Sequence, residues 1–344
     1  MAITVNSRKG CAVVGLSGNE TGQGLLSTAV TLARRFNIEL HLVSVVEPIP
    51  FDLIAFDSPA YLAYPPVNLE IEAQRVKQRE GDLADIIKKL SHNHGVAATG
   101  SVRSGSAAAN LISEAVSRHA NLLLSGYDSE AFRTGASGFT TTLTLMHDAP
   151  LPVLAVPHAK PLDFSKQNFR ILLADDLLDG TQEAARKAYE LAASLPGSHI
   201  RHVHVYGDLQ DRIRRTWQTL VNRSGIHLGE SLITNEDEAI ALEFKARKDR
   251  LSRQAHPFTQ LAEKRDIKVE YDLRSGDVDA ELQVALKDCN PDIAVFGRHH
   301  LLHTRPLLIG RVPFRAMLHF GCGVLTVPPR GDLYAAVPFP AAHV

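Results

Sequence analysis

The chain has 344 residues, 44% of them hydrophobic and 22% charged, which is the balance of a globular protein with room for two domains. Its formal net charge of -1 lacks the basic excess of proteins that bind nucleic acids or anionic membranes. No apolar run is long enough for a signal peptide or a membrane span, so we expect a cytoplasmic protein. Its three scattered cysteines predict neither a disulfide framework nor a zinc site.

The first half of the chain alternates short strand-like runs with amphipathic segments. The predicted strands, of which the continuous apolar ones are typical of a buried parallel sheet, are Cys11–Leu16, Leu40–Val46, Ala97–Val102, Asn121–Ser125 and Pro152–Val156. Apolar residues at helical spacing predict helices at Leu25–Phe36, Glu70–Leu90, Ala108–Val116 and Phe139–His147. The stretch Pro50–Asn68 is predicted to be a long loop, either a surface insertion or a lid, and His158–Asn168 reads as a linker.

The second half repeats the same alternation. The predicted strands are Arg170–Ala174, Ile200–Tyr206, Lys268–Leu273, Ile293–Phe296 and Val324–Val327. The predicted helices are Ala184–Ala192, a long polar region Asp208–Lys264 with a break near Gly225–Thr234, Leu282–Leu286, and one that begins at Gly310. His202 and His204 alternate with valines, which predicts one face of an edge strand or a partly covered strand.

Matching positions in the two halves indicate an internal duplication. Gly105-Ser106 corresponds to Gly276-Asp277, Gly126 to Gly297, and Leu16 is expected to correspond to Asp176. Strands alternating with helices imply parallel sheets with right-handed crossovers. We therefore expect domains at 1–158 and 169–330, followed by a tail at 331–344.

These residues resemble the universal stress protein family in its tandem two-domain form. The resemblance covers nearly the whole chain and is carried by ILLADDLLDGTQEAARKA at 171–188, by the Gly276-Asp277 turn, and by the endings HDAPLPVLAVP and HFGCGVLTVPP. It implies an α/β fold, Rossmann-like and similar to the adenine nucleotide alpha hydrolases, with two five-stranded parallel sheets covered by helices on both faces. It also implies that the last strands pair as an intramolecular pseudo-dimer, with a further homodimer as a possible assembly.

The resemblance also implies a nucleotide site, because ATP-binding members carry an Asp after the first strand and the motif G-x2-G-x9-G-[ST]. Glycines there expose backbone N–H groups to phosphate, and the hydroxyl at the helix start donates to it. In the second half Asp176, Gly297 and Gly310 match this pattern, while His300 replaces the second glycine and Arg311 the hydroxyl residue. These five residues are the candidate ligand-binding site, with ATP as the candidate cofactor.

The first half keeps less of the motif. Leu16 is expected at the acidic position, Gly126 is kept, and Ser129 replaces the second glycine. Phe139 lies either at the third glycine or, with a one-residue deletion, at the hydroxyl position, where its bulk would meet the phosphates. The first half is therefore expected not to bind ATP in the family's mode.

The remaining chemistry-bearing residues predict no catalytic or metal site. No G-x-S-x-G elbow occurs, and His299 and His303 lie in a predicted loop without an acidic residue between them. Our main hypothesis is a non-catalytic stress-response protein that binds a small molecule or nucleotide with an eroded ATP motif. The alternative is an ATP-binding protein with slow hydrolysis at the second-half site, and a third hypothesis places a non-nucleotide ligand behind Pro50–Asn68.

Overall fold

The computed structural model forms two compact units. Unit 1 comprises Met1–Lys166 with Gly323–Val344, and unit 2 comprises Gln167–Cys322. The residues that the structure describes are 10–17, 23–47, 65–130, 139–177, 182–207, 211, 214–216, 236–263, 265, 267–298 and 311–329.

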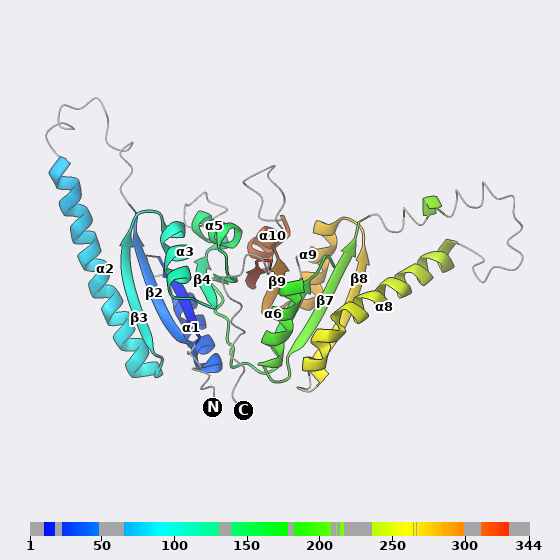
Figure 1. Cartoon of the computed structure of the whole chain (residues 1–344). Coiled ribbons are helices and arrows are strands. Elements are labelled where there is room, and N and C mark those ends of the chain that lie inside the picture. Colours follow the sequence, from blue (N-terminus) through cyan, green and yellow to red (C-terminus); the bar gives the residue numbers. More distant parts are fainter. Residues whose placement is uncertain are drawn as a thin grey trace, which may run out of the picture. The chain divides into compact units, whose positions relative to one another are not determined.

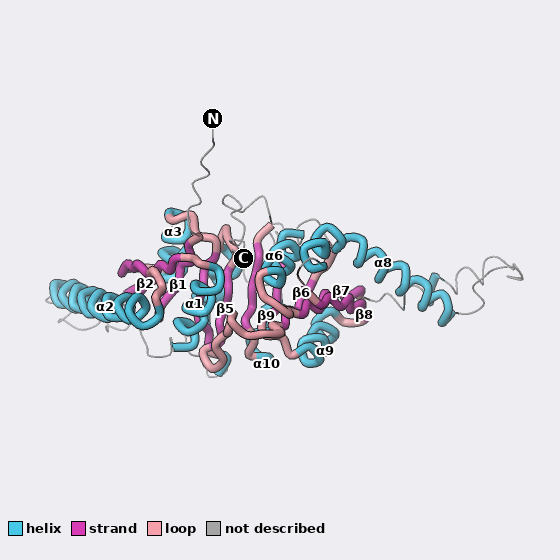
Figure 2. The backbone as a smooth tube through the Cα atoms, turned by 90° about the horizontal axis from the view of Figure 1, so that it is seen from below, coloured by secondary structure: helices cyan, strands magenta, loops and turns pink. Residues whose placement is uncertain are grey.

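Unit 1 is built on a sheet whose parallel strands follow the order β3-β2-β1-β4-β5 (Figure 1). The strands are β1 (Cys11–Leu16), β2 (Glu39–Val46), β3 (Ala98–Ser104), β4 (Leu122–Tyr127) and β5 (Val153–Pro157). The helices are α1 (Gln23–Phe36), α2 (Pro65–His94), α3 (Ala107–Ser117) and α5 (Phe139–Asp148). Figure 2 shows α3 on one face of the sheet and α1 on the other, so the central strands are covered on both sides.

This coverage explains why the sequence reads as short apolar runs. Ala12, Val13 and Val14 of β1 are fully buried, and so are Leu123 and Leu124 of β4, although neighbouring side chains on a strand point to opposite faces. A strand in which polar and apolar residues alternate would instead have a polar face turned toward one of the helix layers. The α/β class and the largely parallel sheet predicted from these runs are confirmed.

The last strand of the second repeat completes the sheet of unit 1. This strand, β10 (Gly323–Val327), pairs antiparallel with β5, with Leu325 opposite Leu154 and Thr326 opposite Val153. Both strands are buried along their whole length. The predicted pairing of the last strands of the two repeats is therefore confirmed, whereas a further homodimer stays a prediction.

Unit 2 repeats the arrangement with parallel strands in the order β9-β6-β7-β8. The strands are β6 (Arg170–Ala174), β7 (His199–Tyr206), β8 (Lys268–Ser275) and β9 (Ile293–Gly297). The long helices are α6 (Gln182–Ala193), α8 (Glu236–Glu263), α9 (Val278–Cys289) and α10 (Arg311–Phe320).

The repeated glycine-polar pairs are helix starts. Gly105 and Gly276 have φ of +114° and +148°, a backbone conformation that favours glycine. The next residue in each case caps a helix, because the Ala109 N–H donates to Ser106 and the Ala280 N–H donates to Asp277. The sequence match between the halves therefore reflects one turn-and-cap structure used twice.

Two expectations from the sequence were wrong. Helix α2 begins at Pro65, so the end of the predicted loop Pro50–Asn68 is helical, because proline fits the first turn of a helix; positions 50–64 lie outside the described residues, as does the predicted break Gly225–Thr234. Strand β7 lies between β6 and β8, so it is not an edge strand. It is the partly covered strand of the other alternative, but His202 and His204 are among its buried residues. The two histidines can occupy buried positions of this strand because each imidazole has a polar partner inside the unit.

Candidate functional site

The candidate ligand site lies where the chain of unit 2 changes direction across its sheet. Strand β6 has β7 on one side and β9 on the other, so the loops that follow β6 and β9 leave the sheet in different directions. In open α/β sheets such a switch point opens a crevice beyond the carboxyl ends of the strands. Asp175 and Asp176 follow β6 there, and Gly297 ends β9.

The structure brings two of the five predicted site residues to this edge. Ala174 pairs with Phe296, so Asp176 and Gly297 each lie just beyond the same rung of the sheet. Arg311 is the first residue of α10, and its side chain lies outside what the structure describes. His300 and Gly310 also lie outside the described residues, and their roles stay predictions. We call Asp175, Asp176 and Gly297 the β6/β9 switch point.

Strand register corrects the predicted match between Leu16 and Asp176. Gly15 pairs with Ser125, just before Gly126, and Ala174 pairs with Phe296, just before Gly297. Leu16 therefore corresponds to Asp175, and the residue at the acidic position of the first half is Ser17. The error of one residue arose because the sequence match was anchored in the following helices, across loops of different length. Neither Leu16 nor Ser17 supplies a carboxylate, so the first half still lacks the acidic group.

In unit 1 the chain fills the space beside the matching glycine. A Cβ placed on Gly126 would lie 2.3 Å from His158 Nε2, and one on Gly24 would lie 2.6 Å from the His158 carbonyl oxygen. The His158 N–H donates to the Tyr127 carbonyl at 2.9 Å, which fixes the backbone there. Burial lowers the pKa of His158 although Asp128 acts to raise it, so the imidazole is neutral at pH 7. A phosphate approaching Gly126 from this side would meet that ring.

In unit 2 a chain of buried polar side chains leads to the switch point. His202 Nε2 lies 3.0 Å from Asp175 Oδ2, and His202 Nδ1 lies 3.2 Å from the Tyr189 hydroxyl. The carboxylate only accepts, so His202 Nε2 carries a proton and donates to Asp175, while the Tyr189 hydroxyl is the polar partner of Nδ1. His202 is 1% exposed and Tyr189 is fully buried, and burial raises the pKa of Tyr189 far above its usual value. We call Asp175, His202 and Tyr189 the buried triad.

The turn after β6 is held in an uncommon backbone conformation. Asp175 Oδ1 accepts the Leu177 N–H at 2.8 Å, and the Asp175 carbonyl accepts from His204 Nδ1 at 2.6 Å. Leu177 has φ of +62°, in the left-handed region, where a non-glycine residue costs on the order of 1 kcal/mol. Asp176 lies between these two anchored residues, so its backbone is fixed from both sides.

His204 brings a further ring to this turn. Burial lowers the pKa of His204, although the bond to the Asp175 carbonyl and the nearby carboxylates act to raise it. The carbonyl only accepts, so Nδ1 carries the proton and Nε2 of the neutral ring is left as an acceptor. Among the described residues this Nε2 has no hydrogen-bond partner. The His204 ring packs against the Tyr206 ring, with 4.1 Å between the two ring centroids. The Arg247 guanidinium lies 4.3 Å from the Tyr206 ring centroid.

Sequence reasoning missed the buried triad. In the sequence Asp175 follows a predicted strand and Tyr189 lies inside the predicted helix Ala184–Ala192, and neither position indicates a partner. The one available signal was the pair of histidines within an otherwise apolar strand. It did not identify partners, because these come from α6 and from the end of β6 and meet only in the folded unit.

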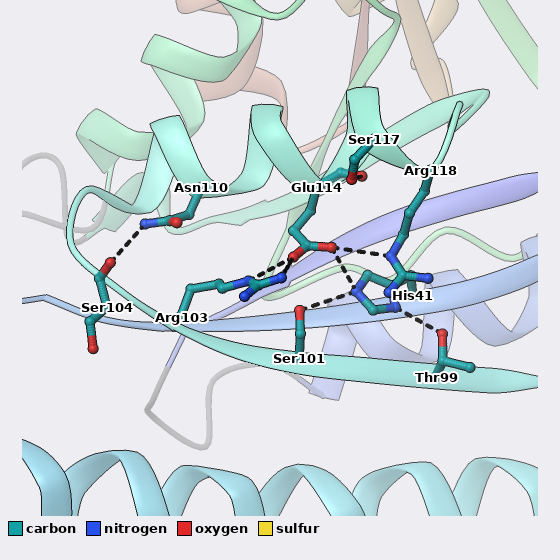
Figure 3. A network of polar contacts seen from close by, with 9 residues as sticks. All are labelled: His41, Thr99, Ser101, Arg103, Ser104, Asn110, Glu114, Ser117 and Arg118. Atoms are coloured by element: carbon teal, nitrogen blue, oxygen red, sulfur yellow. Dashed lines mark hydrogen bonds and ion pairs between the residues drawn. The ribbon is translucent and has the colours of Figure 1, made fainter.

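A second polar cluster lies in unit 1 between α3 and the strands β2 and β3 (Figure 3). Glu114 of α3 is 5% exposed and contacts Arg103, Arg118 and His41, the last two at 3.1 and 3.2 Å. Ser101 also approaches His41 Nε2, at 3.2 Å. In a catalytic triad the acid and the serine face different ring nitrogens, whereas here both face the same one. The cluster is therefore a structural connection between α3 and the strands β2 and β3.

Electrostatics within this cluster keep His41 neutral and Glu114 charged. Burial and the Arg118 guanidinium lower the pKa of His41 to about 4, although Glu114 acts to raise it. Burial alone would raise the pKa of Glu114, but the hydrogen bonds from Arg103 and Arg118 outweigh it and hold that pKa below its usual value. Lowering the pH therefore destabilises the folded unit through both groups, because each takes up a proton less readily in the folded unit than in the unfolded chain.

The His41 shift predicts that unit 1 loses stability as pH falls. Below pH 6.5 the unfolded chain takes up a proton at His41 that the folded unit refuses until about pH 4. We expect the loss from this residue to reach about 1–2 kcal/mol between pH 6.5 and pH 5. Urea unfolding of the wild type and of His41→Gln at pH 7 and pH 5 measures it. The variant should show the smaller change with pH, and equal changes would contradict the assignment.

The described side chains offer no cluster of three or more His, Cys, Asp or Glu that could hold a metal ion. His299, His300 and His303 lie outside that part of the chain. The helices that the structure describes also include none with the length and apolar character needed to cross a membrane.

Comparison with known proteins agrees with the duplication. The model of the universal stress protein family matches residues 12–157 and again 168–328. A solved universal stress protein from Archaeoglobus fulgidus DSM 4304 is 12% identical, with a TM-score of 0.57 over 93% of this chain and 96% of that one. A functionally unknown protein from Pseudomonas aeruginosa PAO1 is 14% identical, with a TM-score of 0.57 over 94% and 93% of the two chains. These likenesses show the fold over both units. No curated protein matches the chain.

Proposed function

Since the chain belongs to the universal stress protein family and carries two of its domains in tandem, we propose that it is a non-catalytic stress-response protein that binds a phosphate-bearing small molecule. The binding site is the β6/β9 switch point of unit 2. The observation that carries this proposal is the difference between the two units at equivalent positions. Unit 2 has Asp176 beside Gly297, and unit 1 has Ser17 beside a glycine covered by His158.

The chemistry of the switch point suits binding. Gly297 allows a phosphate oxygen to approach the backbone closely, and the Asp176 carboxylate accepts hydrogen bonds from ligand hydroxyl groups. Arg311 is the first residue of α10, and a helix N-terminus favours anions.

The hydrogen bonds of the buried triad argue against Asp175 or His202 as a catalytic base. A hydrolytic site needs a carboxylate or histidine that is able to take a proton from water. Asp175 is bonded to His202 and to the Leu177 N–H, and His202 is bonded on both ring nitrogens. Both groups are therefore held by the protein itself.

ATP with Mg²⁺ is the first probe of the site. Native mass spectrometry and thermal unfolding of the full chain should show one nucleotide bound, and saturation to 100-fold over Kd stabilises the folded state by about 2.7 kcal/mol. Asp176→Ala should lose this gain, whereas the matched change Ser17→Ala should keep it. Phosphate release should be no faster in the wild type than in Asp176→Ala. Equal losses in the two variants, or no bound probe in the wild type, would overturn the proposed site.

The second candidate function is ATP binding with slow hydrolysis at the same switch point. It is favoured by the positions of Asp176 and Gly297, which match the family's motif. Phosphate release that disappears in both Asp176→Ala and Gly310→Val would support it against the non-catalytic proposal.

A further inference from the structure

The buried triad has no polar counterpart in unit 1. Strand register places Leu16 at the position of Asp175 and Leu42 at the position of His202. Ala29 stands at the position of Tyr189, by the match of α1 to α6. Leu42 and Ala29 are fully buried and Leu16 is half-buried, so unit 1 has apolar side chains at all three positions.

This comparison shows that the fold does not require the triad. Buried polar groups lose hydration on folding, and apolar side chains of similar volume usually stabilise a protein as well or better. A fully bonded polar network, on the other hand, defines one geometry for its members. Unit 2 carries this costlier core in the half of the chain that also keeps Asp176 and Gly297.

The geometry that the triad defines is that of the turn after β6. Tyr189 orients His202, and His202 orients the Asp175 carboxylate, whose other oxygen accepts the Leu177 N–H. The Asp175 N–H donates to the Val203 carbonyl at 3.0 Å, which ties the turn to β7. The left-handed Leu177 is thus stabilised by a side chain that is itself fixed from inside the core. The corresponding position in the first half carries a glycine, Gly18, a residue type for which the left-handed region is open without such support.

We infer that Asp175, His202 and Tyr189 are positioning residues that hold Asp176 in the orientation that binds the ligand. The inference rests on the proposed function, because it assigns the triad to that binding site. A rigid turn presents the Asp176 carboxylate without the entropy loss of ordering it on binding. Supporting residues of this kind typically change affinity on the order of tenfold to a hundredfold.

The test replaces the triad by apolar side chains. The variant Asp175→Leu/His202→Leu/Tyr189→Phe takes the leucines of unit 1 at the first two positions, keeps the aromatic ring at the third, and leaves Asp176 and Gly297 unchanged. We expect it to unfold at a urea concentration close to that of the wild type and to bind ATP with Mg²⁺ tenfold or more weakly. His202→Leu alone should be the less stable protein, because it leaves the Asp175 carboxylate without its buried partner.

A conservative variant separates geometry from charge. Asp175→Asn keeps an oxygen for the Leu177 N–H, and its NH2 group donates to His202 Nε2 once the ring proton moves to Nδ1 and is donated to the Tyr189 hydroxyl. It should therefore retain affinity within about threefold of the wild type, in contrast to the tenfold loss expected above. Hydrogen exchange at the Leu177 amide measures, without any ligand, whether the turn keeps its hydrogen bond to residue 175. Exchange should be slow in the wild type and in Asp175→Asn, and fast in the apolar triple variant.

The outcomes distinguish this inference from the proposed function. If the wild type binds ATP and the folded triple variant binds it equally well, the triad does not position the site and the inference is wrong. If Leu177 exchanges at the same rate in all variants, the triad does not hold the turn, and the inference fails even where affinity falls. If the wild type shows slow exchange but binds no ATP, the proposed function fails while the role of the triad in the turn stands.

Discussion

Leu325→Asp is expected to lower the free energy of unfolding by about 4 kcal/mol, or to prevent folding altogether. Leu325 is 1% exposed in the middle of β10 and lies opposite Leu154 of β5. A carboxylate there would be removed from water without a partner, because the neighbouring side chains on both strands are apolar or buried. Urea unfolding followed by circular dichroism measures the loss.

The control for this change is Leu242→Asp on α8. Leu242 is 54% exposed, so the same substitution should change stability by no more than about 0.5 kcal/mol. A similarly small effect of Leu325→Asp would show that β10 is not a buried strand of unit 1. A loss of structure confined to the last residues would contradict the pairing as well.

Glu114→Ala is expected to cost about 3 kcal/mol, the second largest effect that the structure predicts. The carboxylate is the common partner of Arg103, Arg118 and His41, and its removal leaves positive charges facing one another and a buried imidazole with one partner fewer. Urea is the suitable denaturant, because guanidinium salts would screen these charges. The loss should be largest near neutral pH, where Glu114 is charged.

The two arginines provide the comparison for Glu114. The side chains of Arg103 and Arg118 are 51% and 40% exposed, so both are largely solvated. When one arginine is removed, Glu114 still has the other as a partner. Arg103→Ala and Arg118→Ala should each cost less than about 1 kcal/mol. Should either arginine variant prove as costly as Glu114→Ala, the cluster is not organised around the carboxylate.

The fold of this chain was largely predictable from local patterns. Continuous apolar runs such as those of β1 and β4 indicate strands covered on both faces, and the paired glycines 105 and 276 mark equivalent turns before helices. The equivalent glycines at positions 126 and 297 then align the sequences of the two repeats. These signals depend on neighbouring residues along the chain, which is why a sequence reveals them.

The candidate site was only half predictable. Asp176 and Gly297 follow strands, and their meeting at one edge depends only on strand order. The link from Asp175 through His202 to Tyr189 depends on how α6 packs on β7, which local patterns do not encode. The match of Leu16 to Asp176 was wrong for a related reason, since a loop that differs by one residue leaves no trace in the strands beside it.

The place of β10 in unit 1 also has a consequence for the order of events during protein synthesis. The ribosome makes β5 early, but the strand that covers its outer edge comes from Gly323–Val327. At usual rates of translation the nascent first unit waits for roughly ten seconds or more with that edge bare. Bare strand edges pair readily with other chains, so nascent chains and prematurely terminated products are the species most exposed to aggregation. Completion of the first unit is thus coupled to completion of the second.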